Sequence, residues 1–333
     1  MKLYLITVVI FCLFINIKAQ SGIKSENFHK HFTLIKKVKL SEKEPIGNIE
    51  ALDVDNKGNL LVTDPIGRNV LIFDSKGKLK KKLLPECYPG YKWDPLHAHY
   101  KKNGNILVIN GIGGFLFGIN GDCIKPLSLN FTSTPHICFL NNGDMVGYYK
   151  FKNFPHLRMM DSAGVEKFSF GKFPDNYKNL FNRITGGGLI SDKDEFIYQL
   201  NSTSPVIFKY NSKGKLIRKF NSTPSYYRAI SKDISNNATP SVLDEIKKVT
   251  TESTLSYSLN LLDDVYLLVQ YFLNGSYGLV ILDLDGHSML KENIIIDKPI
   301  VLAKKGYIYI VQQLDPINGN LPNPYIEIYK YAE

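Results

Sequence analysis

Residues 49–62 read IEALDVDNKGNLLV, and after a short loop residues 69–79 read NVLIFDSKGKL. Each stretch places a turn rich in Asp, Asn, Lys and Gly between two apolar runs of β type. Tight hairpins need positive backbone φ angles or side-chain-to-backbone hydrogen bonds, which Gly, Asn and Asp supply. The two stretches therefore predict two hairpins, which together make a four-stranded antiparallel unit.

Turns of this kind recur along the chain. Six of them join the first and second strands of a unit, at residues 55–58, 101–104, 141–143, 192–194, 262–264 and 304–306. Five join the third and fourth strands, at residues 74–77, 120–122, 161–164, 211–214 and 283–286. A four-stranded repeat of about forty to fifty residues is typical of a β-propeller. We therefore expect an all-β, six-bladed β-propeller of four-stranded antiparallel blades.

The last blade has no turn between a third and a fourth strand. Its strand-like segment Tyr325–Tyr331 is followed by only two residues of the sequence. Another strand-like segment, Phe32–Leu40, precedes the first repeat. We expect this N-terminal strand to close the last blade, because closure ties the two ends of the chain together and removes open sheet edges.

Residues 1–19 have the composition of a secretory signal peptide. A short basic start precedes the apolar residues 3–15, and small residues follow, so we expect cleavage near Ala19. Residues 20–333 would then form a single propeller domain. An insertion at about 221–253 contains helical spacing over residues 241–249. These features predict a secreted or periplasmic protein with no membrane span in its mature form.

The chain is basic. Its formal net charge is +10, and loss of Lys2 and Lys18 leaves +10 − 2 = +8. The lysines are spread through the predicted turns, which is typical of a solvated surface that protects sheet edges. An anion-binding patch is the alternative interpretation. Export argues against nucleic acid as a partner.

Three cysteines remain after cleavage, namely Cys87, Cys123 and Cys138. The number is odd, so at least one is unpaired. Cys123 is expected at the start of an outer strand and Cys138 on an inner strand, which disfavours that pair. We therefore expect no essential disulfide, and the spacing of Cys and His indicates no zinc site.

The stretch Ala51–Asp64, followed by Arg68–Asp74, resembles an NHL-type repeat. The mature chain as a whole is similar to the exported six-bladed β-propeller proteins abundant in Bacteroidetes, although the later blades lack the Asp64/Arg68 combination. The resemblance implies a six-bladed ring outside the cytoplasm. It implies little about activity, since propellers serve as binding modules, scaffolds, lyases and lactonases. We expect Asp64 and Arg68 to pair and to brace the loop between them.

Inner strands line the central channel of a propeller, and the loops at one end of the channel form the usual ligand face. Aligning the blades on their first turns puts His97 and His136 at one position in adjacent blades. His99 faces the same side as His97. These imidazoles could hold a divalent cation, with His97 and His136 as ligands, or exchange protons. The alternative is polar residues in a wet channel, and no other cofactor is predicted.

Further ligand-binding candidates lie in the predicted rim loops, where aromatic residues stand beside Asn, Gln and Gly. They are Trp93, Tyr149, Tyr271 and Gln312. Flat rings stack on sugars and amides form hydrogen bonds, so this composition suits recognition of glycans or peptides. Ordinary loop packing is the alternative. Glu50, at the start of the first inner strand, resembles the metal-binding Glu of gluconolactonase-type propellers.

The sequence therefore predicts an exported binding or interaction propeller that recognises a glycan, a peptide, or a surface or periplasmic protein through its rim loops. The alternative is a metal-assisted lyase or hydrolase, of lactonase type, acting at the channel mouth. The sequence has no GxSxG, HExxH or phosphate-loop motif in a suitable context. This favours the non-catalytic interpretation. A structural subunit of a surface assembly is a third possibility.

Overall fold

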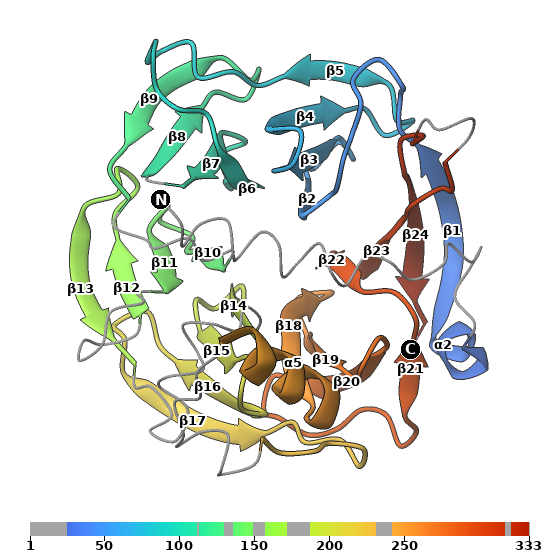
Figure 1. Cartoon of the computed structure of the whole chain (residues 1–333). Helices are drawn as coiled ribbons and strands as arrows, with labels where there is room; N and C mark the ends of the chain where they lie inside the picture. The colour runs from blue at the N-terminus through green and yellow to red at the C-terminus, as the bar shows by residue number, and fades with distance from the viewer. Residues whose placement is uncertain are drawn as a thin grey trace.

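The computed structural model describes residues 25–111, 113–129, 136–148, 157–171, 187–230, 242–316 and 321–332, with Glu26 and residues 242–246 described through their backbone only. These residues form six four-stranded sheets arranged as blades around a ring (Figure 1). Neighbouring strands within every blade are antiparallel. The predicted fold class, a six-bladed propeller, is confirmed.

In blades 1 to 5 the four strands follow one another along the chain, and in every blade the first of the consecutive strands lies nearest the centre of the ring (Figure 1). Blade 1 holds β2 (Ala51–Val54), β3 (Leu60–Asp64), β4 (Asn69–Phe73) and β5 (Leu79–Lys82); blade 2 holds β6 (Pro95–Tyr100), β7 (Ile106–Asn110), β8 (Gly113–Phe117) and β9 (Cys123–Leu127); blade 3 holds β10 (Ile137–Phe139), β11 (Met145–Tyr148), β12 (Leu157–Met160) and β13 (Glu166–Phe170). Blade 4 holds β14 (Gly187–Ser191), β15 (Ile197–Asn201), β16 (Val206–Tyr210) and β17 (Leu216–Asn221); blade 5 holds β18 (Leu255–Leu262), β19 (Tyr266–Phe272), β20 (Tyr277–Asp283) and β21 (Ile294–Ile296). Blade 6 holds β22 (Ile300–Lys304), β23 (Tyr307–Gln312), β24 (Tyr325–Tyr331) and β1 (Phe32–Lys39).

Carboxylate and amide side chains build the repeated turns. Asp74 Oδ1 accepts hydrogen bonds from the backbone amides of Lys76 and Lys78, at 2.8 and 3.0 Å. These amides hold the pKa of the exposed Asp74 carboxyl below its ordinary value. The same pattern recurs at Asp55, Asp161, Asp192, Asn211 and Asp283. This local bonding explains why the turns could be predicted from the sequence.

The N-terminal strand closes the ring. β1 pairs antiparallel with β24 from Phe32 opposite Tyr331 to Lys39 opposite Tyr325, with a bulge between Leu34 and Lys36. The short helix α2 (Glu26–His31) precedes it, and its first turn is capped by Ser25, whose Oγ accepts a hydrogen bond from the amide of Phe28 at 3.2 Å. The first and last described segments of the chain thus share the outer half of blade 6.

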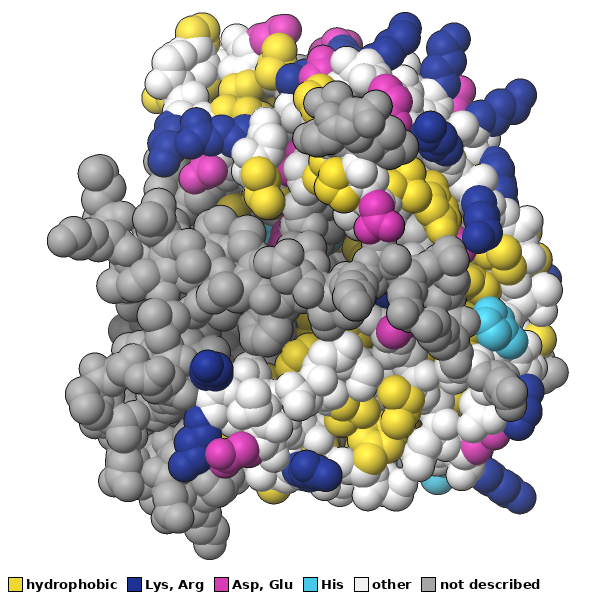
Figure 2. Space-filling model, turned by 45° about the vertical axis from the view of Figure 1, so that its right-hand side comes forward, with side chains coloured by type: hydrophobic (Ala, Val, Ile, Leu, Met, Phe, Trp, Pro, Cys, Tyr) yellow, Lys and Arg dark blue, Asp and Glu magenta, His cyan; other side chains and the backbone are white. Residues whose placement is uncertain are grey.

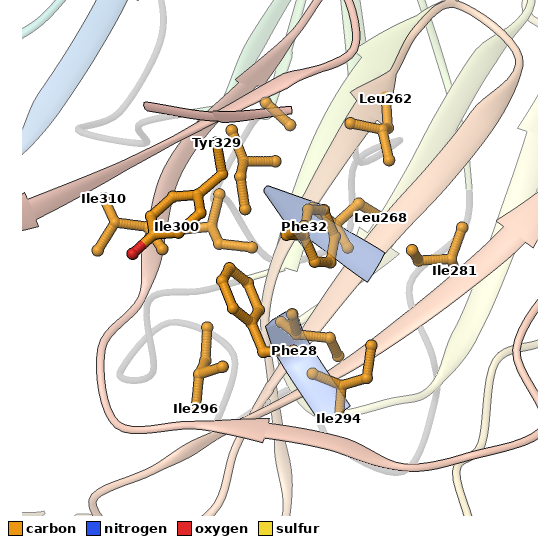
Figure 3. Packing of buried hydrophobic residues seen from close by; sticks show 13 residues of the cluster. Phe28, Phe32, Leu262, Leu268, Ile281, Ile294, Ile296, Ile300, Ile310 and Tyr329 are labelled. Carbon is orange, nitrogen blue, oxygen red and sulfur yellow. The ribbon is translucent and has the colours of Figure 1, made fainter. Parts of the chain in front are cut away.

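Two phenylalanines anchor this closing segment in the core between blades 5 and 6. The rings of Phe28 and Phe32 stack with their centroids 4.7 Å apart, and Phe28 also meets Tyr329 edge-on at 5.1 Å. Figure 3 shows both rings among Ile294, Ile296 and Ile300. Phe28 and Phe32 are 0% and 1% exposed, so the N-terminal segment is part of the hydrophobic core.

The structure contains a disulfide where the sequence predicted no essential one. Cys87, in the loop between β5 and β6, is bonded to Cys123 at the start of β9, with the two Cα atoms 5.3 Å apart. Because Cys87 lies in a loop, strand register gave no sign of which residue it approaches. Cys138 is the free cysteine, and burial raises the pKa of its thiol to about 12.

The insertion between blades 4 and 5 contains α5 (Val242–Glu252), in the segment where apolar spacing predicted a helix. Figure 1 shows α5 in front of the inner strands of blades 4 and 5, on one face of the ring. This face carries the loops that lead into the inner strands. Within the described ranges, no helix combines the length and apolar character that crossing a membrane requires.

Candidate functional site

The inner strands of blades 1, 2 and 6 meet at a buried carboxylate, Asp53 on β2. Its Oδ1 lies 2.6 Å from Nζ of Lys304 on β22, and its Oδ2 accepts a hydrogen bond from the amide of Tyr100 on β6 at 2.7 Å. Lys304 also donates to the carbonyl of Val54 at 2.7 Å. Asp53 is 5% exposed. Its ion pair with Lys304 and its hydrogen bond with Tyr100 together join three neighbouring blades beside the channel.

Next to this ion pair lies a group of histidines from blades 2 and 3. The rings of His97 and His99 on β6 are nearly parallel, at 17°, with centroids 6.5 Å apart. His99 also lies against Phe139 of β10, at 6.1 Å. His136, just before β10, meets Tyr148 edge-on at 5.9 Å and is close enough to His97 to affect its charge. The structure thus brings together the predicted histidines.

The imidazoles of His97 and His99 favour the neutral form. Burial lowers the pKa of His97 well below its ordinary value, and the neighbouring His99 and His136 rings lower it further. Burial also lowers the pKa of His99. The negative charge of Asp53 partly opposes this shift, and the positive charge of Lys304 adds to it. A neutral imidazole carries one donor and one acceptor nitrogen. The Nε2 atom of His99 is buried and makes no hydrogen bond with any described residue.

Glu50 lies just before β2, at the same end of the inner strands as His97 and His136. Burial raises the pKa of its carboxyl to about 7, and Nδ2 of Asn48 lies 3.4 Å from Oε2 of Glu50. Tyr257, near the start of β18 in blade 5, is half-buried, and Glu50 contributes to raising the pKa of its hydroxyl. A carboxyl with this pKa gains and loses protons near neutral pH.

The predicted rim residue Trp93 lies against the core of blade 2. Its ring meets Phe115 and Phe117 edge-on, at 5.6 and 6.2 Å, in the cluster that also includes Cys87 and Cys123. Trp93 is half-buried, and its Nε1 is buried without a hydrogen bond to a described residue. This placement is that of a residue that anchors the loop between β5 and β6.

Two other predicted rim residues are buried away from the histidines. The hydroxyl of Tyr271 on β19 is 2.6 Å from Oγ of Ser222. Gln312 on β23 donates a hydrogen bond to Oε2 of Glu327 at 2.8 Å and also contacts Nζ of Lys298. Both side chains join strands to neighbouring segments. Tyr149 lies outside the described residues.

Asp64 braces its loop, but through the backbone. Its two carboxylate oxygens accept hydrogen bonds from the amides of Gly47, Asn48 and Gly67, at 2.8, 3.1 and 3.0 Å. Arg68 is exposed and has a positive φ of 53°. Asp64 and Arg68, both described, form no ion pair with each other. The predicted brace therefore needs only Asp64, which is fully buried.

The predicted cation site would need at least one further ligand beside His97 and His136. Among the described residues, no group of three or more His, Cys, Asp or Glu side chains is placed to hold a metal ion. His97 and His136 therefore lack a described third ligand.

Sequence reasoning missed Asp53 and Lys304. Asp53 stands in the best repeat, but the repeat pattern assigns it only to a strand. Lys304 lies 251 positions away along the chain, and its contact with Asp53 depends on how the ring closes. The histidines could be found because their positions are equivalent in two neighbouring blades.

A scan of the sequence against protein-family models found no match, and a search of curated proteins found none. Among solved structures, the chain is similar to a DUF4221-family member from Bacteroides vulgatus, at 11% identity and a TM-score of 0.63 over 91% of this chain and 99% of that chain. It is also similar to a candidate exported protein from Bacteroides fragilis, at 12% identity and a TM-score of 0.65 over 95% and 98% of the two chains. A virginiamycin B lyase from Staphylococcus aureus aligns at 11% identity and a TM-score of 0.53 over 90% and 100% of the chains. These likenesses concern the fold, and they confirm the resemblance to exported six-bladed propellers.

Proposed function

We propose that this protein is an exported binding propeller that recognises a glycan, a peptide or a partner protein at the end of the channel where His97 and His136 lie. The observation that carries the proposal is the neutral histidine group, with the unbonded Nε2 of His99. Neutral imidazoles can both donate to and accept from uncharged polar groups, such as sugar hydroxyls and peptide amides. Buried polar atoms without partners are costly, so a ligand that bonds to one gains affinity.

Export is part of the same proposal. Residues 1–19 have signal-peptide character, and a disulfide such as Cys87–Cys123 persists in oxidising compartments. The fold is similar to that of a candidate exported protein. These observations support a secreted or periplasmic location.

The binding proposal predicts that a His97→Gln/His99→Gln variant loses ligand affinity. The purified protein would be screened against an array of neutral oligosaccharides and a peptide library, and the best hit would be titrated by calorimetry. We expect affinity to fall at least about tenfold, since loss of a buried hydrogen-bond pair costs about 1–3 kcal/mol.

The matched control is a His29→Gln/His287→Gln variant, which changes two exposed histidines away from the channel. Its affinity should stay within about twofold of the parent protein, as expected for surface substitutions. Equal binding by the channel variant and the parent protein would place the ligand elsewhere.

The second candidate is a metal-assisted lyase or hydrolase, and Glu50 is the observation that favours it. A carboxyl whose pKa is raised to about 7, at the same end of the inner strands as neutral histidines, could act as an acid or base in catalysis. Structures with similar folds include a virginiamycin B lyase and a candidate gluconolactonase.

Metal content separates the two candidates. The enzyme candidate predicts a stoichiometric divalent cation in the purified protein and a rise in melting temperature on adding Mg²⁺, Ca²⁺, Mn²⁺ or Zn²⁺. A His97→Ala/His136→Ala variant should lose both signals. The binding candidate, which we favour, predicts no bound cation and the same melting temperature with and without added cations.

A further inference from the structure

A groove with a cavity volume of about 690 Å³ opens at the other end of blade 6, where the turns between first and second strands lie. It sits between the turn of blade 5, the turn of blade 6 and the paired strands β1 and β24. Its lining combines lysines, tyrosines and small polar residues: Thr33, Ile35, Asp263, Lys305, Gly306, Tyr307, Lys330, Tyr331 and Ala332. The histidine group belongs to blades 2 and 3, whereas the groove is lined by the turn of blade 5 and by strands and the turn of blade 6, so this groove is a separate feature.

The two lysines of the groove are available to a ligand. Lys305 and Lys330 are exposed, and within the described ranges no carboxylate lies within ion-pair distance of either. Lys305 Nζ donates one hydrogen bond, to Oδ1 of Asn56 at 2.7 Å, which leaves its charge uncompensated. The lining includes one carboxylate, that of Asp263, which lies beside Gly306. The groove therefore carries a net positive charge.

The positive surface continues onto blade 1. Nζ of Lys36 on β1 contacts the carbonyl of Ser75, which places Lys36 at the next turn. Lys57 and Lys76 are exposed and follow Asn56 and Ser75 in sequence. Figure 2 shows Lys and Arg side chains projecting along the upper right edge of the molecule, the side where blades 1 and 6 lie in Figure 1. A row of exposed lysines attracts a polyanion.

Aromatic rings lie directly beside the lysines. Thr33, Lys330 and Tyr307 are register partners on β1, β24 and β23, so their side chains share one face of the sheet. Tyr331, the next residue of β24, faces the other side of the sheet, where it packs against Phe32 and Tyr266 at 5.4 and 5.9 Å, and its partly exposed ring also lines the groove. Tyrosine rings stack on sugar rings while their hydroxyls bind polar groups. Adjacent ammonium groups would bind the carboxylates or sulfates of an acidic sugar.

We propose that this groove binds a segment of an acidic polysaccharide, with Lys305 and Lys330 on its anionic groups and Tyr307 and Tyr331 against its rings. A flexible chain can enter a concave groove and then follow the lysines onto blade 1. A flat bilayer cannot reach the rings inside the groove while it contacts both lysines. The chemistry therefore favours a polysaccharide over an anionic lipid surface.

The test measures binding of the purified full-length protein to polygalacturonate and chondroitin sulfate, with dextran as the neutral probe. The parent protein should bind at least one acidic polymer and not dextran, and binding should weaken as salt is raised from about 0.05 to 0.5 M. A Lys305→Gln/Lys330→Gln variant should lose at least about tenfold in affinity, with its melting temperature unchanged because both lysines are exposed.

A matched control, Lys193→Gln/Lys213→Gln, removes the same charge from turns at the same end of blade 4, on the far side of the ring. It should retain affinity within about twofold. Equal losses of affinity in both variants would mean that the overall charge of the protein drives binding, and this would overturn the proposed groove site. Binding to phosphatidylglycerol vesicles but to neither acidic polymer would also overturn the proposal, as would equal binding to dextran. None of these outcomes depends on the histidines, so the channel proposal stands or fails separately.

Discussion

Removal of residues 25–40 should leave a protein that no longer folds cooperatively. The deletion takes away the outer strand of blade 6 and exposes the edge of β24 along the whole register from Tyr325 to Tyr331. It also removes Phe28, Phe32, Val38 and Leu40, which are at most 2% exposed. Truncating each large core side chain costs about 2–5 kcal/mol, and whole domains are stable by about 5–15 kcal/mol. The combined loss therefore approaches or exceeds the total stability.

Far-UV circular dichroism and thermal melting measure this effect. A milder variant, Phe28→Ala/Phe32→Ala, should lower the free energy of unfolding by at least about 5 kcal/mol, because each Phe→Ala change costs about 3–5 kcal/mol. The control is Ile35→Thr on the same strand, where the side chain is 54% exposed and the change should cost less than about 0.5 kcal/mol. A deletion variant that melts like the full protein would contradict the closing role of β1.

The closing strand could be predicted because two independent signals agreed. The last repeat lacked its fourth strand, and a strand-like segment before the first repeat belonged to no blade. The turn residues predicted where the other strands begin and end, since residues such as Asp55 and Asp74 accept hydrogen bonds from amides two and four positions later. Such signals are local in sequence, so they can be read without knowing the tertiary structure.

The contents of the site were less predictable, for a physical reason. The group of His97, His99 and His136 was recognised because strand register fixes which residues of neighbouring blades are equivalent. Gln312 was assigned to the rim by loop composition, yet it bonds to Glu327, a carboxylate 1% exposed. Burial raises the pKa of the Glu327 carboxyl, but hydrogen bonds from Lys37, Gln312 and Tyr329 outweigh this effect. The pKa of Glu327 therefore lies below its ordinary value. Such networks depend on packing between strands far apart in sequence, which composition does not reveal.

Breaking the disulfide between Cys87 and Cys123 is expected to have the second large effect. The bond closes a loop with a sequence separation of 36 residues. Restricting the unfolded chain over a loop of this length stabilises the folded state by roughly 4 kcal/mol. A Cys87→Ser/Cys123→Ser variant should therefore melt well below the parent protein. Treatment of the parent protein with a reductant should lower its melting temperature to the same value.

Trp93, the one tryptophan of the sequence, allows this test to follow the loop itself as well as the stability of the whole protein. Trp93 packs in the same cluster as Cys87 and Cys123, against Phe115 and Phe117. If the disulfide holds the loop between β5 and β6 against blade 2, its reduction should shift Trp93 fluorescence to the red below the melting temperature. Cys138→Ser is the control, because that thiol is buried and unpaired; its melting temperature should respond to reductant as the parent protein's does. If reductant changes neither the melting temperature nor the Trp93 emission of the parent protein, packing alone holds the loop.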